Sequence, residues 1–482
     1  MSATPFYITT TLPYVNAPLH MGHALEFVRA DALARYRASV GDDVFFNTGT
    51  DEHGQKIFSK AAEAGKTPQQ FVDEAFAVFR EQVRAFGISE EAHFIRTTDA
   101  HHLNAAQEFW QLVENNGYIY KKQYQTKYCV GCEAEKTDSE LVDGHCPLHP
   151  TLALELIDEE NYFFKLSSLQ DELRALYERA PDFIIPSFRL NEMKAFVDRG
   201  LEDFSISRLK EKMPWGVPVP GDDTQVMYVW FDALTNYIST LGWPENKEAF
   251  ARYWQEGTPT QYCGKDNTRF QGIIWQAMLI AAGLPTSRRI VVNGFIIGEG
   301  GVRMSKTLGN VVDPLAIAKE YGTDALRLFL LKEVSSFEDS PFTIERFREV
   351  YNANLANGLG NLVSRVLTLA EKYIEPIALI GEGETELSQK IAAAMGVFDI
   401  QKAIAHLWEE ISDMDKTIAE TKPFLVIKED EEKGKTLIAT CVQQLTVIAQ
   451  ALVPFLPDTS EKILSLIREN KKPETPLFAR LA

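Results

Sequence analysis

The pattern of apolar and polar positions divides the chain into a part that alternates strands with helices and a later part that is helical. Residues 6–11 are rich in aromatic and β-branched side chains and predict a buried strand, and residues 43–47 predict a second one. Between them, the apolar side chains of residues 24–34 recur at helical spacing, so a helix is expected to begin near Leu19 or His20. Strands and helices in this alternating order indicate the α/β class.

A further amphipathic helix is expected after Lys66-Thr67-Pro68, because threonine followed by proline is typical of a helix start. Its apolar positions recur every three or four residues. The spacing predicts an inward face formed by Phe71, Ala75, Val78 and Phe79.

The last third of the chain carries three long apolar repeats at helical spacing. They run from Leu355 to Leu369, from Ile404 to Ile418 and from Ile438 to Leu452. The tetrapeptide 458–461, Asp-Thr-Ser-Glu, is typical of the capped start of a short final helix. Together these elements predict an antiparallel helical bundle from about residue 346.

Composition limits the classes of protein that the chain can belong to. Its 482 residues are enough for about three domains, and the net charge of −19 argues against nonspecific coating of nucleic acid. No apolar run approaches the roughly 20 residues of a membrane span, and no signal peptide is expected before the first strand. Three of the five cysteines lie between positions 129 and 146, which favours a metal site in a reducing cytoplasm over disulfides.

The turn after the first strand carries two histidines, His20 and His23, with Gly22 between them. A helix that starts here presents free backbone N–H groups and the positive end of its dipole, which suits phosphate groups. Imidazoles at this position can donate to the oxygens of a pentavalent phosphorus during nucleotidyl transfer. The tetrapeptide 20–23 also fits a solvated helix end or a pair of metal ligands.

A lysine on a glycine-flanked loop, Lys306 in Arg303-Met-Ser-Lys-Thr307, could neutralise a triphosphate as pyrophosphate leaves. Alone, this loop would fit a basic surface turn. The pair formed by His20-Met-Gly-His23 and the Lys306 loop resembles the signatures of class I aminoacyl-tRNA synthetases, written HIGH and KMSKS.

Further candidate residues follow the predicted strands. Asp51 lies at the carboxyl end of the second strand, where it could bind an ammonium group or act as a helix cap. The main sheet is expected to resume in the stretch 225–237, which places Trp230, Ala233 and Tyr237 on one side as an aromatic slot or as ordinary core. A later strand-to-helix turn carries Lys265 and Asp266, which could contact the phosphate and ribose of a nucleotide.

An insertion over about 116–225 carries the pattern Cys129-x₂-Cys132 and Cys146-x₂-His149. Two such knuckles supply the four ligands that tetrahedral Zn²⁺ prefers, and four ligands leave no open position. We therefore expect one structural zinc ion, with His145 as a competing fourth ligand.

These motifs, taken in order, narrow the resemblance to the methionyl-tRNA synthetase family over nearly the whole chain. The resemblance implies a Rossmann-type catalytic domain split by a zinc-knuckle insertion and followed by a helical anticodon-binding domain. It implies that the following residues bind methionine: Leu12, Tyr14, Asp51, Trp230, Ala233, Tyr237, Phe270, Gln271 and Trp275. It implies that the following residues bind ATP, with His20, His23 and Lys306 as the catalytic ones: His20, Gly22, His23, Lys265, Asp266 and Lys306.

The same resemblance assigns reading of the CAU anticodon to Asn361, Arg365, Pro423 and Phe424, which without it would be scaffold residues. The chain departs from the family pattern at three positions. Gln271 stands where histidine is frequent, Phe424 where tryptophan is more common and Arg303 where the first lysine of KMSKS is expected.

The predicted activity is ATP-dependent charging of tRNA(Met) with methionine, with Mg²⁺ accompanying ATP, by a cytoplasmic monomer. The predicted segments are 1–115 and 226–298 for the two halves of the catalytic domain, 116–225 for the insertion, 299–345 for the Lys306 loop region and 346–482 for the bundle. Rival functions are a synthetase for another aliphatic amino acid, a noncatalytic tRNA-binding relative and a small nucleotidyltransferase. The last would not account for the zinc knuckles or the bundle.

Overall fold

The computed structural model describes residues 3–132, 134–136, 138–301, 312–377 and 385–481. The described residues form two compact units. The first is drawn from the ranges Met1–Leu19, Asp42–Gln82 and Glu90–Val292, and the second from His20–Gly41, Val83–Ser89 and Asn293–Ala482. The structure does not test the five predicted segments, which stay a prediction.

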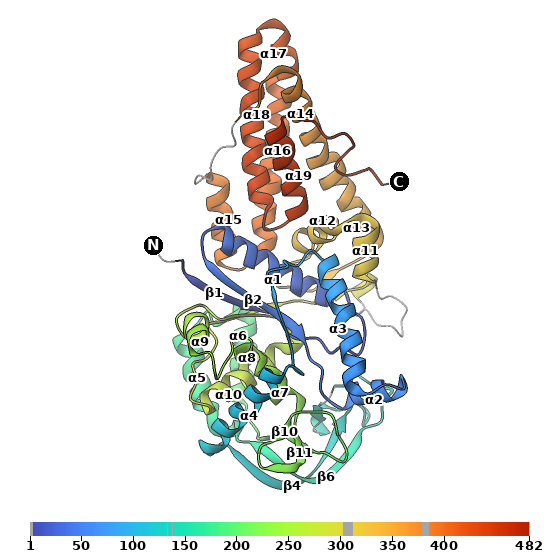
Figure 1. Ribbon diagram of the computed structural model, residues 1–482, viewed down its shortest axis with the longest axis vertical. Helices are drawn as coiled ribbons and strands as arrows, with labels where there is room; N and C mark the ends of the chain where they lie inside the picture. Colours follow the sequence, from blue (N-terminus) through green and yellow to red (C-terminus); the bar gives the residue numbers. More distant parts are fainter. Residues whose placement is uncertain (1–2, 133, 137, 302–311, 378–384, 482) are drawn as a thin grey trace. The chain divides into compact units, whose positions relative to one another are not determined.

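A six-stranded sheet lies within the first unit, in the order β3-β2-β1-β12-β13-β7. Its strands are β1 (Pro5–Thr9), β2 (Asp43–Thr50), β3 (His93–Arg96), β7 (Ile184–Ile185), β12 (Thr260–Gly264) and β13 (Arg289–Asn293). Strands β1 and β2 lie side by side in Figure 1. β1 pairs in parallel with β2 on one side and with β12 on the other, so the strand order reverses at β1. Open α/β sheets bind ligands beyond the carboxyl ends of the strands at such a switch point. The predicted α/β class is confirmed.

The second strand is longer than the sequence pattern predicts. The expected strand ended at Asn47, but β2 continues to Thr50 because residues Asn47–Thr50 pair with His93–Arg96 of β3. This extension carries the chain directly to Asp51 at the edge of the sheet.

The expectation that the main sheet resumes at Gln225 is wrong. β11 (Asp222–Met227) pairs antiparallel with β9 (Ser207–Leu209) and β10 (Pro218–Val219) in a separate small sheet. Gly221, with a φ of 77°, permits the tight turn between β10 and β11 that leads to this pairing. The main sheet resumes only at β12.

An antiparallel ribbon makes up much of the predicted insertion. β4 (Ile119–Cys129) pairs with β6 (Glu155–Phe164) from Ile119 opposite Phe164 to Tyr128 opposite Glu155. Two short strands, β5 (Ala134–Lys136) and β8 (Phe204–Ser205), flank the ribbon. One strand that lies within the predicted insertion, β7, instead pairs in parallel with β13 at the edge of the main sheet.

Helices pack around these sheets in the first unit. They are α2 (Gln55–Glu63), α3 (Pro68–Ala85, whose last three residues belong to the second unit), α4 (Ala100–Asn115), α5 (Gln170–Arg179), α6 (Ser187–Asp198), α7 (Val229–Leu234), α8 (Asn236–Ser239), α9 (Lys247–Phe250) and α10 (Trp275–Ala281). The predicted inward face of α3 is partly wrong, because Val78 is 47% exposed whereas Val72 is fully buried together with Phe79. The helix starts at Pro68 as predicted, and Thr67 Oγ1 accepts from the Gln70 N–H.

The first helix in sequence order, α1 (Met21–Ser39), belongs to the second unit, and it begins where the sequence predicts. Two buried charged side chains of α1 anchor the helix to other residues of this unit. The Arg29 guanidinium donates to the carbonyl oxygens of Val334 and Ser336, and the Asp31 carboxylate lies 2.8 Å from the Arg327 guanidinium. The sequence pattern alone did not indicate these contacts.

The remainder of the second unit is mainly helical (Figure 1). Its elements are β14 (Ile296–Ile297), α11 (Pro314–Tyr321), α12 (Thr323–Leu328), β15 (Ser340–Pro341), α13 (Ile344–Val350), α14 (Asn361–Tyr373), α15 (Glu386–Gly396), α16 (Ile400–Thr421), α17 (Pro423–Glu429), α18 (Glu431–Leu452) and α19 (Pro457–Glu469). The predicted helical region is confirmed, and α14, α16 and α18 carry the three apolar repeats. The first repeat begins in a π-helical segment, Tyr351–Gly360, that leads into α14.

The final helix starts one residue earlier than the tetrapeptide 458–461 predicts. Pro457 occupies its first turn, where the missing N–H costs nothing, so Asp458 lies inside the helix instead of capping it. Among the described residues, no helix combines the length and apolar character needed to cross a membrane.

Candidate active site and metal centre

Several predicted substrate residues follow the strands that meet at the switch point. Asp51 comes directly after β2, and its backbone N–H donates to the Pro13 carbonyl at 3.0 Å. A parallel bridge joins Asp51 to Tyr14, which follows β1. The Asp51 side chain is therefore held beside Tyr14, and Asp51 is only 3% exposed.

Aromatic rings from three segments meet beside this edge. The Trp230 and Phe270 rings stack with centroids 3.8 Å apart at 11°, and Tyr14 meets Trp230 edge-on at 6.5 Å. A ligand cannot lie between two rings in van der Waals contact. The stack can therefore supply a wall of a methionine site, but it leaves no slot between the two rings.

The floor of this region is polar and buried. Tyr237 is 2% exposed, and its hydroxyl accepts from Gln271 Nε2 at 2.5 Å. This hydrogen bond joins two of the residues that the family resemblance assigns to methionine binding. Trp275 packs against Tyr237 with centroids 5.8 Å apart and is itself fully buried, and Ala233 is 6% exposed.

Gln271 belongs to a buried network that the sequence pattern did not indicate. Its Oε1 accepts from Gln261 Nε2 at 2.7 Å, and Gln261 Oε1 accepts from the Ser287 hydroxyl at 2.6 Å. Gln276 Nε2 donates to the Gln271 carbonyl at 2.8 Å. Because each amide has one donor end and one acceptor end, this network fixes the orientation of the Gln271 amide toward Tyr237.

A second buried network joins two motifs of the candidate site. The Asp232 carboxylate lies 2.6 Å from His53 Nδ1 and 2.8 Å from His102 Nε2, and His102 Nδ1 lies 2.8 Å from the Ser239 hydroxyl. Burial alone would raise the pKa of Asp232, but the interactions with His53 and His102 outweigh it and lower this pKa to about 2. The ionised carboxylate thus connects the segment after β2 with α7.

In the second unit, His20 and His23 cap the start of α1 reciprocally. His20 Nδ1 accepts from the backbone N–H groups of Gly22 and His23, and His23 Nδ1 accepts from the backbone N–H of His20. A neutral imidazole that accepts at Nδ1 carries its proton on Nε2. Burial, followed by the neighbouring His20, lowers the pKa of His23 well below its usual value, so His23 is neutral near pH 7.

The two imidazole rings are parallel, with centroids 3.7 Å apart. A Cβ at Gly22 would lie 3.0 Å from Cε1 of His20, which is tighter than ordinary contact. Gly22 therefore gives room to the His20 ring itself, and the reciprocal cap places the proton of each neutral ring on Nε2.

The other residues predicted to bind the nucleotide lie in different parts of the chain. Lys265 and Asp266 form a short 3₁₀ turn directly after β12, in the first unit, with Asp266 exposed. Lys306 and the adjoining Arg303 lie outside the described residues. The predicted methionine residues all belong to the first unit, where Asp51, Tyr14, Trp230 and Phe270 meet, and where Tyr237 contacts Gln271 and Trp275. His20 and His23 belong to the second unit.

The ribbon of β4 and β6 ends in the predicted metal cluster. The ligand atoms of Cys129, Cys132, Cys146 and His149 all lie within 4.8 Å of one another. His149 Nδ1 is 3.2 Å from Cys132 Sγ and 3.7 Å from Cys129 Sγ, and Cys132 Sγ is 3.4 Å from Cys146 Sγ. Zn–S bonds of roughly 2.3 Å in a tetrahedron place sulfur atoms about 3.8 Å apart, so the cluster fits the size of a zinc site.

His145, the competing ligand, does not belong to this cluster. Its Nδ1 lies 2.9 Å from the Asp143 carbonyl at the surface. Gly131 is required within the knuckle, because a Cβ there would lie 2.5 Å from Cγ of His149.

Removal of the metal is expected to loosen the insertion before it affects the reaction centre. The four ligands leave no position open for substrate, so a metal bound there would supply folding energy instead of chemistry. Chelation should therefore expose residues 129–149 to a protease while pyrophosphate exchange persists. A chelator that abolished exchange at once, with the insertion still protected, would contradict the structural role.

The helical bundle contains a cavity of about 350 Å³ in which predicted anticodon residues meet. Arg365, Pro423 and Phe424 line it, together with apolar side chains of α14, α16 and α18, whereas Asn361 is not among the residues that line it. The Arg365 guanidinium lies 2.6 Å from the Asp415 carboxylate, and Phe424 is 43% exposed. Lys422, in the left-handed conformation with φ of 45°, ends α16 and directs the chain into α17.

The strand order, the histidine-capped helix and the Cys/His cluster define the class of protein. A family model described as tRNA synthetases class I (M) matches residues 6–153 and 151–367. The chain is therefore an aminoacyl-tRNA synthetase of class I.

Similarity to individual proteins identifies the particular family. The chain is 41% identical over 472 residues to the methionine–tRNA ligase of Caldanaerobacter subterraneus, covering 95% of this chain and 73% of that protein. It is 40% identical to the methionine–tRNA ligase of Mesorhizobium japonicum, covering 97% and 92%. A structure of Mycobacterium tuberculosis methionyl-tRNA synthetase in complex with methionyl-adenylate superposes with a TM-score of 0.90 at 34% identity, covering 99% of this chain and all of that one. The chain belongs to the methionine–tRNA ligase family.

Proposed function

We propose that the chain activates L-methionine with Mg-ATP to methionyl-adenylate and transfers the methionyl group to the 3′ end of tRNA(Met). The observation that carries this proposal is the meeting of Asp51, Tyr14, Trp230 and Phe270 at the switch point of the sheet. The Mycobacterium tuberculosis relative of the same fold is described as a complex with methionyl-adenylate.

In the first step, the methionine carboxylate attacks the α-phosphorus of ATP, a P–O bond forms and pyrophosphate leaves. No side-chain nucleophile is required, so catalysis consists of positioning and charge stabilisation. Asp51 would bind the ammonium group, because it is a buried carboxylate at the edge of the site. The aromatic wall of Trp230 and Phe270 would contact the thioether, since sulfur packs favourably on ring edges.

Phosphate binding is assigned to His20, His23 and Lys306. The capping geometry supports this assignment for the two histidines, because backbone contacts at Nδ1 fix the rings and place the proton of each neutral ring on Nε2. The family resemblance also assigns nucleotide binding to Gly22, Lys265 and Asp266, and Mg²⁺ would accompany the triphosphate.

In the second step, a ribose hydroxyl of the terminal adenosine attacks the adenylate carbonyl, and AMP leaves. Recognition of the anticodon is assigned to Asn361, Arg365, Pro423 and Phe424. The apolar cavity that three of these residues line suits a single unstacked base, which proteins bind by stacking and hydrogen bonds. Phe424 supplies a ring for stacking without the N–H of an indole.

The proposal includes a structural zinc ion on the four-ligand cluster and a monomer that acts in the cytoplasm. The free state of all five cysteines supports a reducing compartment.

A pyrophosphate-exchange assay across amino acids tests the proposal. We expect exchange with methionine that is at least about a hundredfold faster than with leucine, isoleucine or valine, because only methionine carries the thioether that fits the aromatic wall. Exchange with another aliphatic amino acid instead would show that the substrate assignment is wrong. Binding of tRNA without any exchange would identify a noncatalytic relative.

A further inference from the structure

Glu52 is a fully buried carboxylate that directly follows Asp51 and has no part in the proposed chemistry. Burial of a charged group costs free energy unless hydrogen bonds and an opposite charge compensate it. The contacts of Glu52 must therefore compensate the cost of burying its carboxylate.

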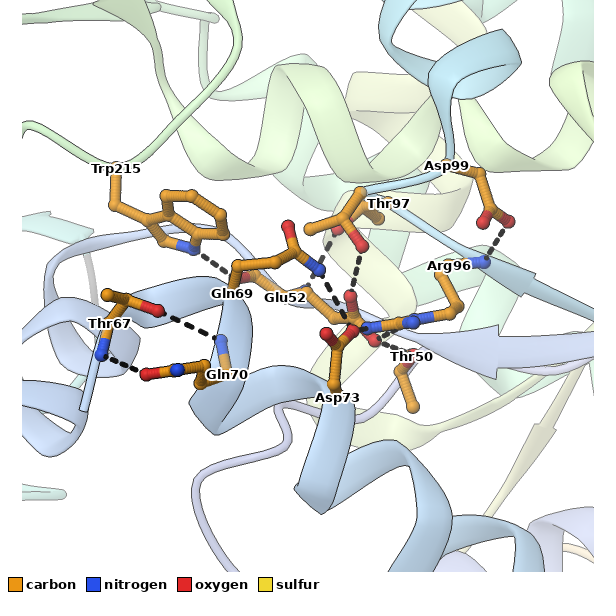
Figure 2. Close-up of polar contacts among 11 residues, drawn as sticks. Thr50, Glu52, Thr67, Gln69, Gln70, Asp73, Arg96, Thr97, Asp99 and Trp215 are labelled. Carbon is orange, nitrogen blue, oxygen red and sulfur yellow. Dashed lines mark hydrogen bonds and ion pairs between the residues drawn. The ribbon is translucent and has the colours of Figure 1, made fainter. Parts of the chain in front are cut away.

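Every polar group of Glu52 takes part in a hydrogen bond (Figure 2). Its Oε1 accepts from the Thr50 hydroxyl at 2.7 Å and from Arg96 Nε at 2.8 Å, and its Oε2 accepts from the Thr98 hydroxyl. Its backbone N–H donates to Thr97 Oγ1 at 2.9 Å, and its carbonyl accepts from Trp215 Nε1 at 2.6 Å.

Arg96 offsets the charge of Glu52 and connects it to α3. Its guanidinium pairs with Glu52 and also lies 2.6 Å from the Asp73 carboxylate (Figure 2). Asp73 is half exposed and binds Nη2 of the guanidinium, whereas Glu52 binds its Nε.

The extended backbone at Asp51 and Glu52 determines how their two side chains point relative to each other. Asp51 continues the extended chain of β2, because its N–H and carbonyl pair with Pro13 and Val15 of the segment after β1. Successive side chains of an extended chain point to opposite sides. Anchoring Glu52 on one side therefore determines that Asp51 points to the other.

We propose that Glu52 is a positioning residue that orients the Asp51 carboxylate toward the ammonium group of the amino acid. The inference rests on the proposed function, since it concerns the same pocket. In this proposal, Thr50, Thr98 and Arg96 hold the Glu52 side chain in place and thereby set the direction of the Asp51 side chain.

Glu52→Gln tests the proposal, because it keeps the size of the side chain but replaces one acceptor oxygen with a donor that faces N–H or O–H groups. The readout is the preference for methionine over its des-amino analogue, 4-(methylthio)butanoate, measured as inhibition or saturation in pyrophosphate exchange. The analogue lacks the ammonium group, so its affinity reports the slot without Asp51.

We expect Glu52→Gln to lower the preference for methionine by about tenfold or more while the affinity for the analogue changes by less than about threefold. The matched control is Asp73→Asn, which removes the outer contact of Arg96 and should leave the preference within about twofold. If Glu52→Gln does not fold, Thr98→Val decides, since it removes one donor to Glu52 and should lower the preference by about threefold.

Equal weakening of both ligands, or an unchanged preference in the folded variant, would overturn the positioning role. Asp51→Asn separates this failure from failure of the proposed function. If Asp51→Asn abolishes the preference while the Glu52 and Thr98 variants keep it, only the positioning role is wrong. If Asp51→Asn keeps the preference, the ammonium site itself is misassigned.

Discussion

Lys306→Ala is expected to slow adenylate formation by about a hundredfold or more while the affinity for methionine stays within about twofold. The reason is that the role proposed for Lys306 is to neutralise the charge that develops as pyrophosphate leaves, and this charge is absent from the complex with methionine alone. Single-turnover formation of the adenylate measures the first quantity, and calorimetric titration with methionine measures the second.

Lys60→Ala is the matched control for this variant. Lys60 is exposed on α2 and pairs with Glu63, so its loss should change neither quantity. Equal losses of rate and methionine affinity in Lys306→Ala would show that the lysine acts on the bound amino acid, and the assignment to the phosphates would then be wrong.

Asp232→Asn is expected to lower the free energy of unfolding by about 3–5 kcal/mol, because it leaves buried imidazoles without their carboxylate. The carboxylate contacts both His53 and His102, and all three side chains are buried. Urea denaturation at pH 7 measures the loss. Asp171→Asn is the control, because Asp171 forms a surface pair with Arg174 and its removal should cost less than about 0.5 kcal/mol.

The same network predicts the direction of a pH effect. The pKa of Asp232 in the folded chain is about 2, below its usual 3.8, so its stabilising contribution is present above pH 3.8 and is lost as the pH falls toward 2. The wild-type chain should therefore lose more stability across this interval than Asp232→Asn. Parallel losses in the two proteins would show that Asp232 does not carry this part of the acid response.

Local patterns in the sequence predict a helix or a metal cluster well where the residues that form it are neighbours in the chain. The helix after His20, the helix after Thr67 and the Cys/His cluster all follow from residues that are neighbours in the chain. The hydrogen bond between Gln271 and Tyr237 could be anticipated because the two residues belong to motifs of one pocket.

Features that depend on partners far along the chain could not be predicted in this way. β11 has an ordinary strand pattern, yet which sheet it joins depends on its turn with β10 and on pairing with β9. The acidic and amide side chains of Glu52, Gln261 and Asp232 resemble surface residues in the sequence, and only the folded chain shows that they are buried. Val78 shows the same limit, because a helical stripe indicates a face without fixing its edges.

The short strand β7 has a consequence for engineering of the enzyme. Ile184 and Ile185 lie within the predicted insertion, yet they complete the parallel sheet by pairing with Ile290 and Val291 of β13. A chimera that exchanged the whole insertion for that of a relative would uncover the backbone of β13, and an open strand edge promotes association between chains. Grafts of the zinc ribbon should therefore be cut within the antiparallel ribbon itself, so that the recipient keeps its own edge strand.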